Sequence, residues 1–188
     1  SLPHTFVAEG GSLVVELAPS LAASMLSALD VLEHSPYEST EETLSRFLPN
    51  LETYRALQAL GSSTPALQAQ LERTLKDGLS RLQATQAVDG GWSWWSGGSS
   101  DPYVTAYVVF GLSRARDAGI AVNADSLQRA SDYLLATLLP LTSLADAMPE
   151  SWQLDRQAFT YFALAQAGTQ DLSGVRSLAG SSERLSPW

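Results

Sequence analysis

The sequence predicts an all-α fold, and two observations carry this prediction. The apolar residues are rich in Leu and Ala, which favour helices, whereas the β-branched runs of a sheet protein are scarce. Helix-capping signals also recur along the chain, each followed by apolar residues at helical spacing. With 188 residues, 45% of them hydrophobic, the chain is long enough for one sizeable core and short for two ordinary domains.

Charge and composition argue against several kinds of partner and site. Acidic residues outnumber basic ones by 20 to 11, the formal net charge is −9, and no cluster of Lys and Arg is present. Nucleic acid and anionic membrane surfaces are therefore disfavoured as partners. The absence of cysteine removes disulfides, thiolate catalysis and Cys-based zinc sites. No apolar stretch approaches the ~20 residues of a membrane span, so direct membrane insertion is not expected.

Residues 1–17 differ from the rest of the chain. Gly10-Gly11 is a turn signal, and residues 13–17 have the composition of a short strand. A single strand is not stable alone. We therefore expect an extended linker or strand over residues 1–17, paired with something outside this chain, and a helical domain over residues 18–188.

Three helices are expected before a glycine-rich loop at residues 89–100. A cap residue begins each helix, because its side chain accepts a hydrogen bond from a backbone amide of the first turn, and Pro or Gly ends it. A kink or a break is expected around Pro49 in the second helix. The helices run from Ser20 to His34 before Pro36, from Ser39 to Leu60 before Gly61, and from Thr64-Pro65 along a stripe of Leu67, Leu71, Leu75, Leu79 and Leu82 interrupted by Gly78.

Further helices are expected after the loop. The first follows Asp101-Pro102, the next begins at Asn123 or Asp125 and is closed by Pro140, another runs from Glu150 to Ala167 with Gly168 after it, and Asp171 caps a last short one. Helices of similar length with short connections and one apolar face each predict stacked antiparallel hairpins. Such arrays either extend as solenoids or close into rings, and periodicity leaves both open.

The glycine- and tryptophan-rich segment at residues 86–108 is the most informative part of the sequence. Its glycines permit a tight reversal with positive φ. Its indoles are expected to fold back as a plug over the helix ends, where their N–H groups reach free carbonyls. The alternative is a stacking platform of Trp94 and Trp95 for sugar or peptide. We favour the structural interpretation, in which the motif comprises Asp89, Gly90, Gly91, Trp92, Trp94, Trp95, Asp101, Pro102 and Tyr103.

The string DGGWSWWSGGSSDPYVTAYVVFGL, which begins at Asp89, resembles a segment of bacterial alpha-2-macroglobulins. The block at residues 35–49 resembles the "YPYGC-x-EQT-x-SRFLP" motif of the same family. The resemblance covers approximately residues 13–188. It implies an α/α toroid of antiparallel helical hairpins, of which residues 18–188 form the N-terminal half or more as a partial ring. The linker over residues 1–17 then comes from a preceding β-rich domain.

In that family, the Cys and Gln of the CxEQ motif condense into an internal thioester, whose acyl carbon is open to a lysine amine of an attacking protease. The aligned positions here are Ser39 and Glu42. A serine hydroxyl is hardly ionised at neutral pH, and an ionised carboxylate is a poor acyl donor. The resemblance therefore implies a degenerate thioester motif at Ser39 and Glu42, flanked by Pro36, Tyr37, Glu38, Thr40 and Glu41.

Ser39 and Glu42 also match a capping box, in which the serine accepts from the N3 amide and the glutamate reaches back to the cap. Glu38, Glu41 and Glu42 suit a helix N-terminus, where negative charge is stabilising. We therefore predict that the pair stabilises the helix and stores no acyl-transfer energy. The intact mass should then equal the sequence mass, with no loss of water.

Two histidines and several carboxylates are the remaining candidates for chemistry. Neither histidine has an evident third member for a nucleophilic triad. Carboxylate pairs could serve acid–base roles in a glycosidase, but most such residues are simply solvated. We therefore expect no catalytic residue, no metal and no cofactor. The residues concerned are His4, His34, Glu41 with Glu42, and Asp146 with Glu150.

The resemblance implies a non-enzymatic module of a bacterial protease-trapping inhibitor that lacks covalent capture. Its partners would be proteases, as prey of the full-length protein, and the other domains of its own chain, in the periplasm or cell envelope. One alternative is an α/α-toroid enzyme, cyclase or glycosidase-like, because Gln86-x-x-x-Gly90-Gly91-Trp92 is similar to the QW motif of terpene cyclases. However, the aspartate-rich cluster of a cyclase is missing. Another alternative is a plain protein-binding scaffold in an envelope complex.

Overall fold

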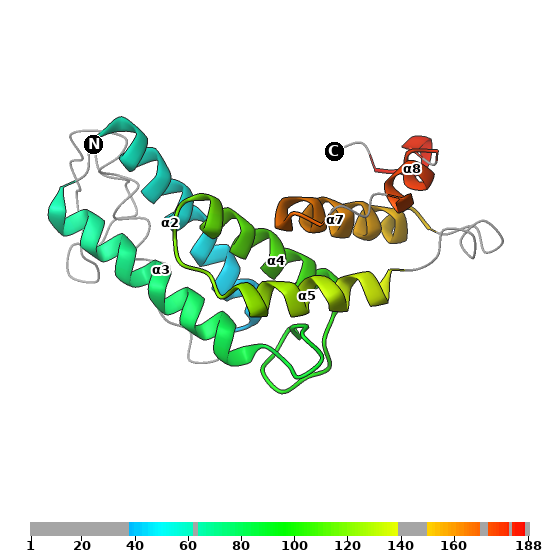
Figure 1. Ribbon diagram of the computed structural model, residues 1–188, viewed down its shortest axis with the longest axis horizontal. Coiled ribbons are helices and arrows are strands. Elements are labelled where there is room, and N and C mark those ends of the chain that lie inside the picture. The colour runs from blue at the N-terminus through cyan, green and yellow to red at the C-terminus, as the bar shows by residue number, and fades with distance from the viewer. Residues whose placement is uncertain (1–37, 62–63, 139–149, 170–172, 181, 187–188) are drawn as a thin grey trace, which may run out of the picture. The chain divides into compact units, whose positions relative to one another are not determined.

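The computed structural model describes residues 38–61, 64–138, 150–169, 173–180 and 182–186. The chain divides into two compact units, Ser1–His34 and Ser35–Trp188, and every described residue belongs to the second. The regular elements of the described residues are helices: α2 (Thr40–Leu60), α3 (Pro65–Thr85), α4 (Pro102–Asp117), α5 (Ala124–Thr137), α7 (Ser151–Ala167), α8 (Ser173–Ala179) and the 3-10 turn η1 (Ser182–Arg184), coloured from blue to red in Figure 1. The all-α prediction is confirmed. The expected linker and first helix lie outside the described residues.

The helices begin and end close to the expected positions because the expected caps form. Thr64, Asp101 and Asn123 each accept a hydrogen bond from a backbone N–H of the turn that follows. Of the two residues proposed to start α5, the structure selects Asn123. Gly61 and Gly168 end α2 and α7 with φ of 59° and 95°, a left-handed conformation that favours glycine.

α2 runs without a break through Pro49, so of the two outcomes expected there, a kink or a break, the break is excluded. A proline inside a helix removes one backbone donor and normally disrupts the helix. Here the amide Nδ2 of Asn50 donates to the Arg46 carbonyl at 2.8 Å, and Thr53 Oγ1 donates to the Pro49 carbonyl at 2.8 Å. These bonds lie on the turns on either side of the proline and do not replace the backbone N–H that Pro49 lacks, so the helix continues with that one donor missing.

α4 lies at the centre of the packing. It contacts α2, α5 and α7, while α3 packs against α2 (Figure 1). The pairs α2–α3 and α4–α5 are consecutive helices with short connections, as expected for helical hairpins. Six hydrophobic residues of α4 have 2% exposure or less, namely Val104, Ala106, Val108, Val109, Leu112 and Ala115. This buried helix determines where the loop before it and the helices beside it lie.

Two glycines let the neighbours of α2 approach it closely. A Cβ atom on Gly78 of α3 would stand 2.9 Å from Phe47 Cδ2, and one on Gly111 of α4 would stand 2.8 Å from Leu44 Cδ2. Both distances are shorter than a van der Waals contact between carbons. The glycine that interrupts the leucine stripe of α3 therefore has a packing role.

Candidate functional site

The N-terminus of α2 contains the capping box that the sequence predicts. Ser39 Oγ accepts a hydrogen bond from the Glu42 N–H at 3.0 Å, and Glu42 Oε2 accepts one from the Ser39 N–H at 2.7 Å. Ser39 is 6% exposed, with an extended backbone at φ −71° and ψ 163°. The predicted capping box is confirmed, and its hydroxyl and carboxylate oxygens both accept from backbone amides.

Glu38 is buried at the entrance of the same helix. Its side chain is 3% exposed and forms ion pairs with Arg46 of α2 and Arg81 of α3. A buried carboxylate needs such partners, because burying an unpaired charge is costly. The two flanking residues Pro36 and Tyr37 lie outside the described residues.

The first residue of α2 is joined to the tryptophan-rich loop. The Thr40 N–H donates to the Trp94 carbonyl at 3.0 Å, and Thr40 Oγ1 donates to the Ser93 carbonyl at 2.7 Å. The next residue, Glu41, accepts a hydrogen bond from Ser45 Oγ. The two blocks that carry the family resemblance, 53 residues apart, therefore meet in one place.

Trp92 fastens the loop to the end of α3. Its indole is fully buried, and Nε1 donates to the Leu82 carbonyl at 2.8 Å. Leu82 belongs to the last turn of α3, where carbonyls run out of intrahelical donors. The Trp92 N–H donates to Thr105 Oγ1 at 2.9 Å, and the Trp92 carbonyl accepts from the Asp101 N–H at 2.8 Å. The expected covering of a helix end is confirmed for this indole.

Trp94 and Trp95 do not cover helix ends in this way. They are 43% and 60% exposed, so the expectation of a plug of indoles is wrong for these two residues. The reason is a tight turn at the tip of the loop, in which the Gly98 N–H donates to the Trp95 carbonyl at 3.0 Å. Trp94 stacks on Tyr103 of α4 with ring centroids 6.4 Å apart.

The loop packs against α5 through one glycine and one glutamine. Gly90 has φ of 92°, the positive value expected, and a Cβ atom on it would stand 2.4 Å from the Arg129 carbonyl oxygen. Gln86 Nε2 donates to the carbonyls of Gly90 and Ser126, both at 2.9 Å. Gln86 belongs to the motif found in the sequence, but its bond to α5 was not predicted. The sequence does not show which helix lies against the loop.

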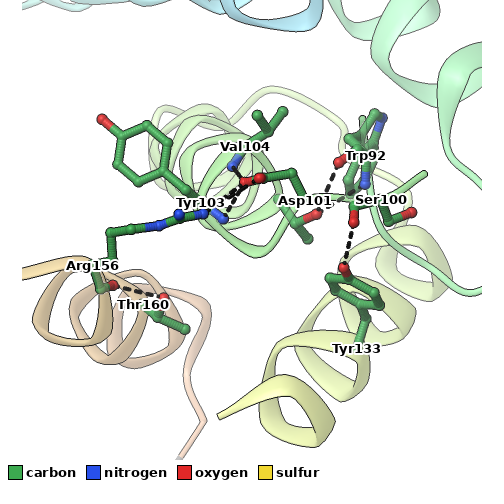
Figure 2. Close-up of polar contacts among 9 residues, drawn as sticks. Trp92, Ser100, Asp101, Tyr103, Val104, Tyr133, Arg156 and Thr160 are labelled. Carbon is green, nitrogen blue, oxygen red and sulfur yellow. Dashed lines mark hydrogen bonds and ion pairs between the residues drawn. The ribbon is translucent and has the colours of Figure 1, made fainter. Parts of the chain in front are cut away.

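Asp101 joins α4 to α7. Its Oδ1 accepts from the N–H groups of Tyr103 at 2.8 Å and Val104 at 3.1 Å, and Arg156 Nη2 of α7 donates to the same atom at 3.1 Å (Figure 2). The Arg156 guanidinium carbon also lies 5.6 Å from the centre of the Tyr103 ring. Sequence reasoning missed Arg156, since a single arginine within a helix has no local signal.

Tyr133 of α5 bonds to the residue just before Asp101. Its hydroxyl donates to the Ser100 carbonyl at 3.0 Å (Figure 2). Burial raises the pKa of Tyr133 above its usual value of 10.0, and the negative charges of Asp89 and Asp101 raise it further. Helices α3, α4, α5 and α7 are therefore all tied to residues 86–101.

The carboxylates considered for acid–base chemistry have structural roles where they are described. Glu42 belongs to the capping box of α2, and Glu150 is the N-cap residue of α7. His4, His34 and Asp146 lie outside the described residues. In the described part of the chain, no three His, Cys, Asp or Glu side chains are placed to hold a metal ion, and no helix is long and apolar enough to cross a membrane.

The profile of the A-macroglobulin TED domain matches residues 12–148. An alpha-2-macroglobulin of Xylella fastidiosa is 35% identical over 172 residues, which are 88% of this chain and 10% of that protein. One of Thermotoga maritima is 31% identical over 134 residues, 71% of this chain and 8% of that protein. The crystal structure of trypsin-activated alpha-2-macroglobulin from Escherichia coli matches with a TM-score of 0.60 and 27% identity, over 82% of this chain and 11% of that one.

The chain thus spans about a tenth of the length of the proteins that it matches. The helical hairpins described above correspond to the helical domain of the solved structure, so the predicted fold class, an all-α partial toroid of hairpins, is confirmed.

Proposed function

Since the chain belongs to the A-macroglobulin TED domain family, we propose that it is the thioester-type module of a bacterial protease-trapping inhibitor and that it acts without covalent capture. Trypsin activates a solved relative from Escherichia coli, which supports proteases as the prey of the full-length protein. The proposal includes a linker over residues 1–17, the helical domain over residues 18–188, and a location in the periplasm or cell envelope. The other domains of the same chain are the further partners.

The observation that carries the non-covalent part is the capping box at the aligned thioester positions. The sequence has no cysteine, so the sulfur of a thioester has no source within these residues. Ser39 Oγ accepts from the Glu42 N–H, and the Glu42 carboxylate accepts from the Ser39 N–H. The pair therefore holds a helix end and no activated acyl group.

The same observation supports a module that is not an enzyme. The serine that replaces the expected nucleophile is 6% exposed; its hydroxyl accepts from the Glu42 backbone N–H, and its own N–H donates to the Glu42 carboxylate. A nucleophilic serine needs a base that takes its proton, whereas in the described part of the chain the Ser39 hydroxyl oxygen accepts a hydrogen bond from the Glu42 N–H. What remains is a folded unit that holds its neighbours in the larger protein.

Intact mass spectrometry tests the chemistry of the pair. We expect the mass of the sequence, with or without prior incubation in methylamine. The double variant Ser39→Ala/Glu42→Ala, which cannot form a bridge, is the control and should show the same absence of an adduct. A wild-type mass lower by one water, or an adduct with methylamine that the control lacks, would overturn the non-covalent part of the proposal.

Protease challenge of the full-length protein tests the trapping. After addition of trypsin we expect a mobility shift on native gels and loss of trypsin activity on large substrates, with activity on small substrates retained. Denaturation should then release the trypsin completely, because no bond joins it to this module. If cleavage leaves the shape unchanged and trypsin fully active on large substrates, trapping is wrong and a plain scaffold is favoured.

A further inference from the structure

A pocket of about 420 Å³ lies where α4 begins, beside the end of α5 and the first turns of α7. This volume lies in the range of small-molecule sites, ~300–1,000 Å³. The lining combines two aromatic rings, one ion pair and several uncharged polar groups. Its main members are Asp101, Tyr103, Trp152, Arg156, Gln157 and Thr160.

The rim of the pocket carries two exposed aromatic rings from different helices. Tyr103 of α4 is 38% exposed, and Trp152 of α7 is 53% exposed. The Arg156 guanidinium carbon lies 5.6 Å from the centre of the first ring and 5.9 Å from the second, so one cation holds both. Exposed rings with a polar edge are suited to stacking on a flat, partly apolar ligand.

Two residues of α7 that line the pocket are polar and buried. Gln157 is 6% exposed and Thr160 is 5% exposed. The Thr160 hydroxyl donates to the Arg156 carbonyl at 2.9 Å, and its oxygen can still accept from a ligand. A side-chain amide carries both donors and acceptors. Groups that both donate and accept, such as the hydroxyls of a sugar, match these two residues.

The charge of the pocket favours a neutral ligand. Arg156 Nη2 lies 3.1 Å from Asp101 Oδ1 and 3.3 Å from Oδ2, so the positive charge already has a partner. The whole chain has a net charge of −9, which repels anions. A peptide that binds by strand addition needs an unpaired sheet edge, and the elements that line this pocket are helices.

We propose that this pocket binds a neutral saccharide of one or two rings, with its flat face on Trp152 and its hydroxyls on Gln157 and Thr160. The site contains no residue of the α2 cap, so the proposal does not depend on protease trapping. Failure of the saccharide proposal would leave the trapping proposal intact, and failure of trapping would leave the saccharide proposal intact.

Saturation-transfer NMR and calorimetric titration of the chain test this site. The probes are cellobiose, maltose and N,N′-diacetylchitobiose, with D-glucuronate as the anionic comparison. We expect at least one of the three disaccharides to bind in the millimolar range or more tightly, with saturation transferred to the ring protons. Glucuronate should bind more weakly.

Variants locate the binding. Trp152→Ala should weaken it about tenfold or more, and Thr160→Val, which keeps the shape and removes the hydroxyl, should weaken it about threefold. Trp95→Ala is the matched control, since this tryptophan is 60% exposed and outside the pocket lining. Circular dichroism checks that each variant is folded, and Thr160→Val keeps the test valid if Trp152→Ala is not.

Three results would overturn the proposal. None of the three disaccharides binds, or glucuronate binds as tightly as they do, or Trp95→Ala abolishes binding that Trp152→Ala and Thr160→Val leave unchanged. The last result would move the sugar site to the exposed tip of the loop.

Discussion

Gly90 and Gly97 show how two residues of one loop with similar backbone angles can be constrained differently. Both have positive φ, 92° and 83°. A Cβ atom on Gly90 would lie 2.4 Å from the Arg129 carbonyl oxygen, whereas one on Gly97 would have no atom within 4 Å. At position 90, glycine is required both by the positive φ and by the close Arg129 carbonyl. At position 97, it is required by the positive φ alone.

Substitution of each glycine by alanine separates the two effects. Gly97→Ala should lower the free energy of unfolding by about 1 kcal/mol, from the strained backbone alone. Gly90→Ala should cost a further ~1–3 kcal/mol, because the loop or α5 has to move. Urea unfolding of both variants measures the difference. Equal losses would mean that the loop and α5 are not in the contact described.

Tyr133 predicts a dependence of stability on alkaline pH. Because burial raises the pKa of Tyr133 above 10.0, the folded state holds the phenol proton more tightly than the unfolded state. The stabilisation from this group is therefore complete below pH 10 and is lost as pH rises through the folded pKa. Tyr133→Phe should remove that part of the decline, and at pH 7 it should cost ~0.5–1.5 kcal/mol for the lost bond to Ser100.

Unfolding measured at neutral pH and between about pH 9 and pH 11 checks both parts. If the stability of wild type and Tyr133→Phe falls in parallel over the alkaline range, the phenol does not titrate differently in the folded state.

At the scale of elements, residues 86–101 act as a connector for the surrounding helices. The loop is bonded to α3 through Trp92, to α5 through Gln86 and to α2 through Thr40. At its end, Asp101 binds Arg156 of α7. Because so few residues make these connections, single side chains in the loop should influence the stability of several helices.

Trp92→Phe tests the connection to α3. Phenylalanine keeps an aromatic ring in the core but removes the indole donor, so the Leu82 carbonyl keeps only the longer bond from Thr85 Oγ1 at 3.3 Å. The loss of one such hydrogen bond should cost ~0.5–1.5 kcal/mol. Trp95→Phe, at a 60% exposed position of the same loop, should change stability by less than about 0.5 kcal/mol. Chemical unfolding of both variants provides the comparison. Equal effects would show that the indole N–H of Trp92 does not matter.

At the scale of the whole described unit, the parts predicted from sequence are those that depend on neighbours along the chain. The caps at Ser39 and Asn123 bond to residues three positions away, so a local pattern reveals them. The bond from Arg156 to Asp101 joins residues 55 positions apart, and the one from Tyr133 to Ser100 spans 33. These depend on helix packing, which periodicity does not determine.

Of the kink or break expected at Pro49, the break is excluded, because α2 continues through this residue. The side-chain amide of Asn50 lies buried, at 5% exposure, against the carbonyl of Arg46. A rule for proline counts the lost backbone donor but not the tertiary packing, which buries Leu44, Phe47 and Leu51 on both sides of Pro49.

Central packing predicts unequal local stability across this unit. Val108, Val109 and Leu112 of α4 are fully buried, and α4 contacts three other helices. The main contact of α8 is α7. In native-state hydrogen exchange, the amides of α4 should therefore exchange most slowly and those of α8 early. Exchange of α4 and α8 at the same rate would indicate that the unit opens only as a whole.

The close contacts of α2 with two glycines have a consequence for its axial position. Leu44 and Phe47, one turn apart, each lie against a glycine of a different neighbour, Gly111 and Gly78. A shift of α2 by one residue, about 1.5 Å along its axis, would place both side chains against positions without that space. Translation of the helix is therefore blocked from two sides, at points beyond its first turn. These two contacts therefore fix the position of Ser39 along the axis of α2, independently of the hydrogen bonds of the cap.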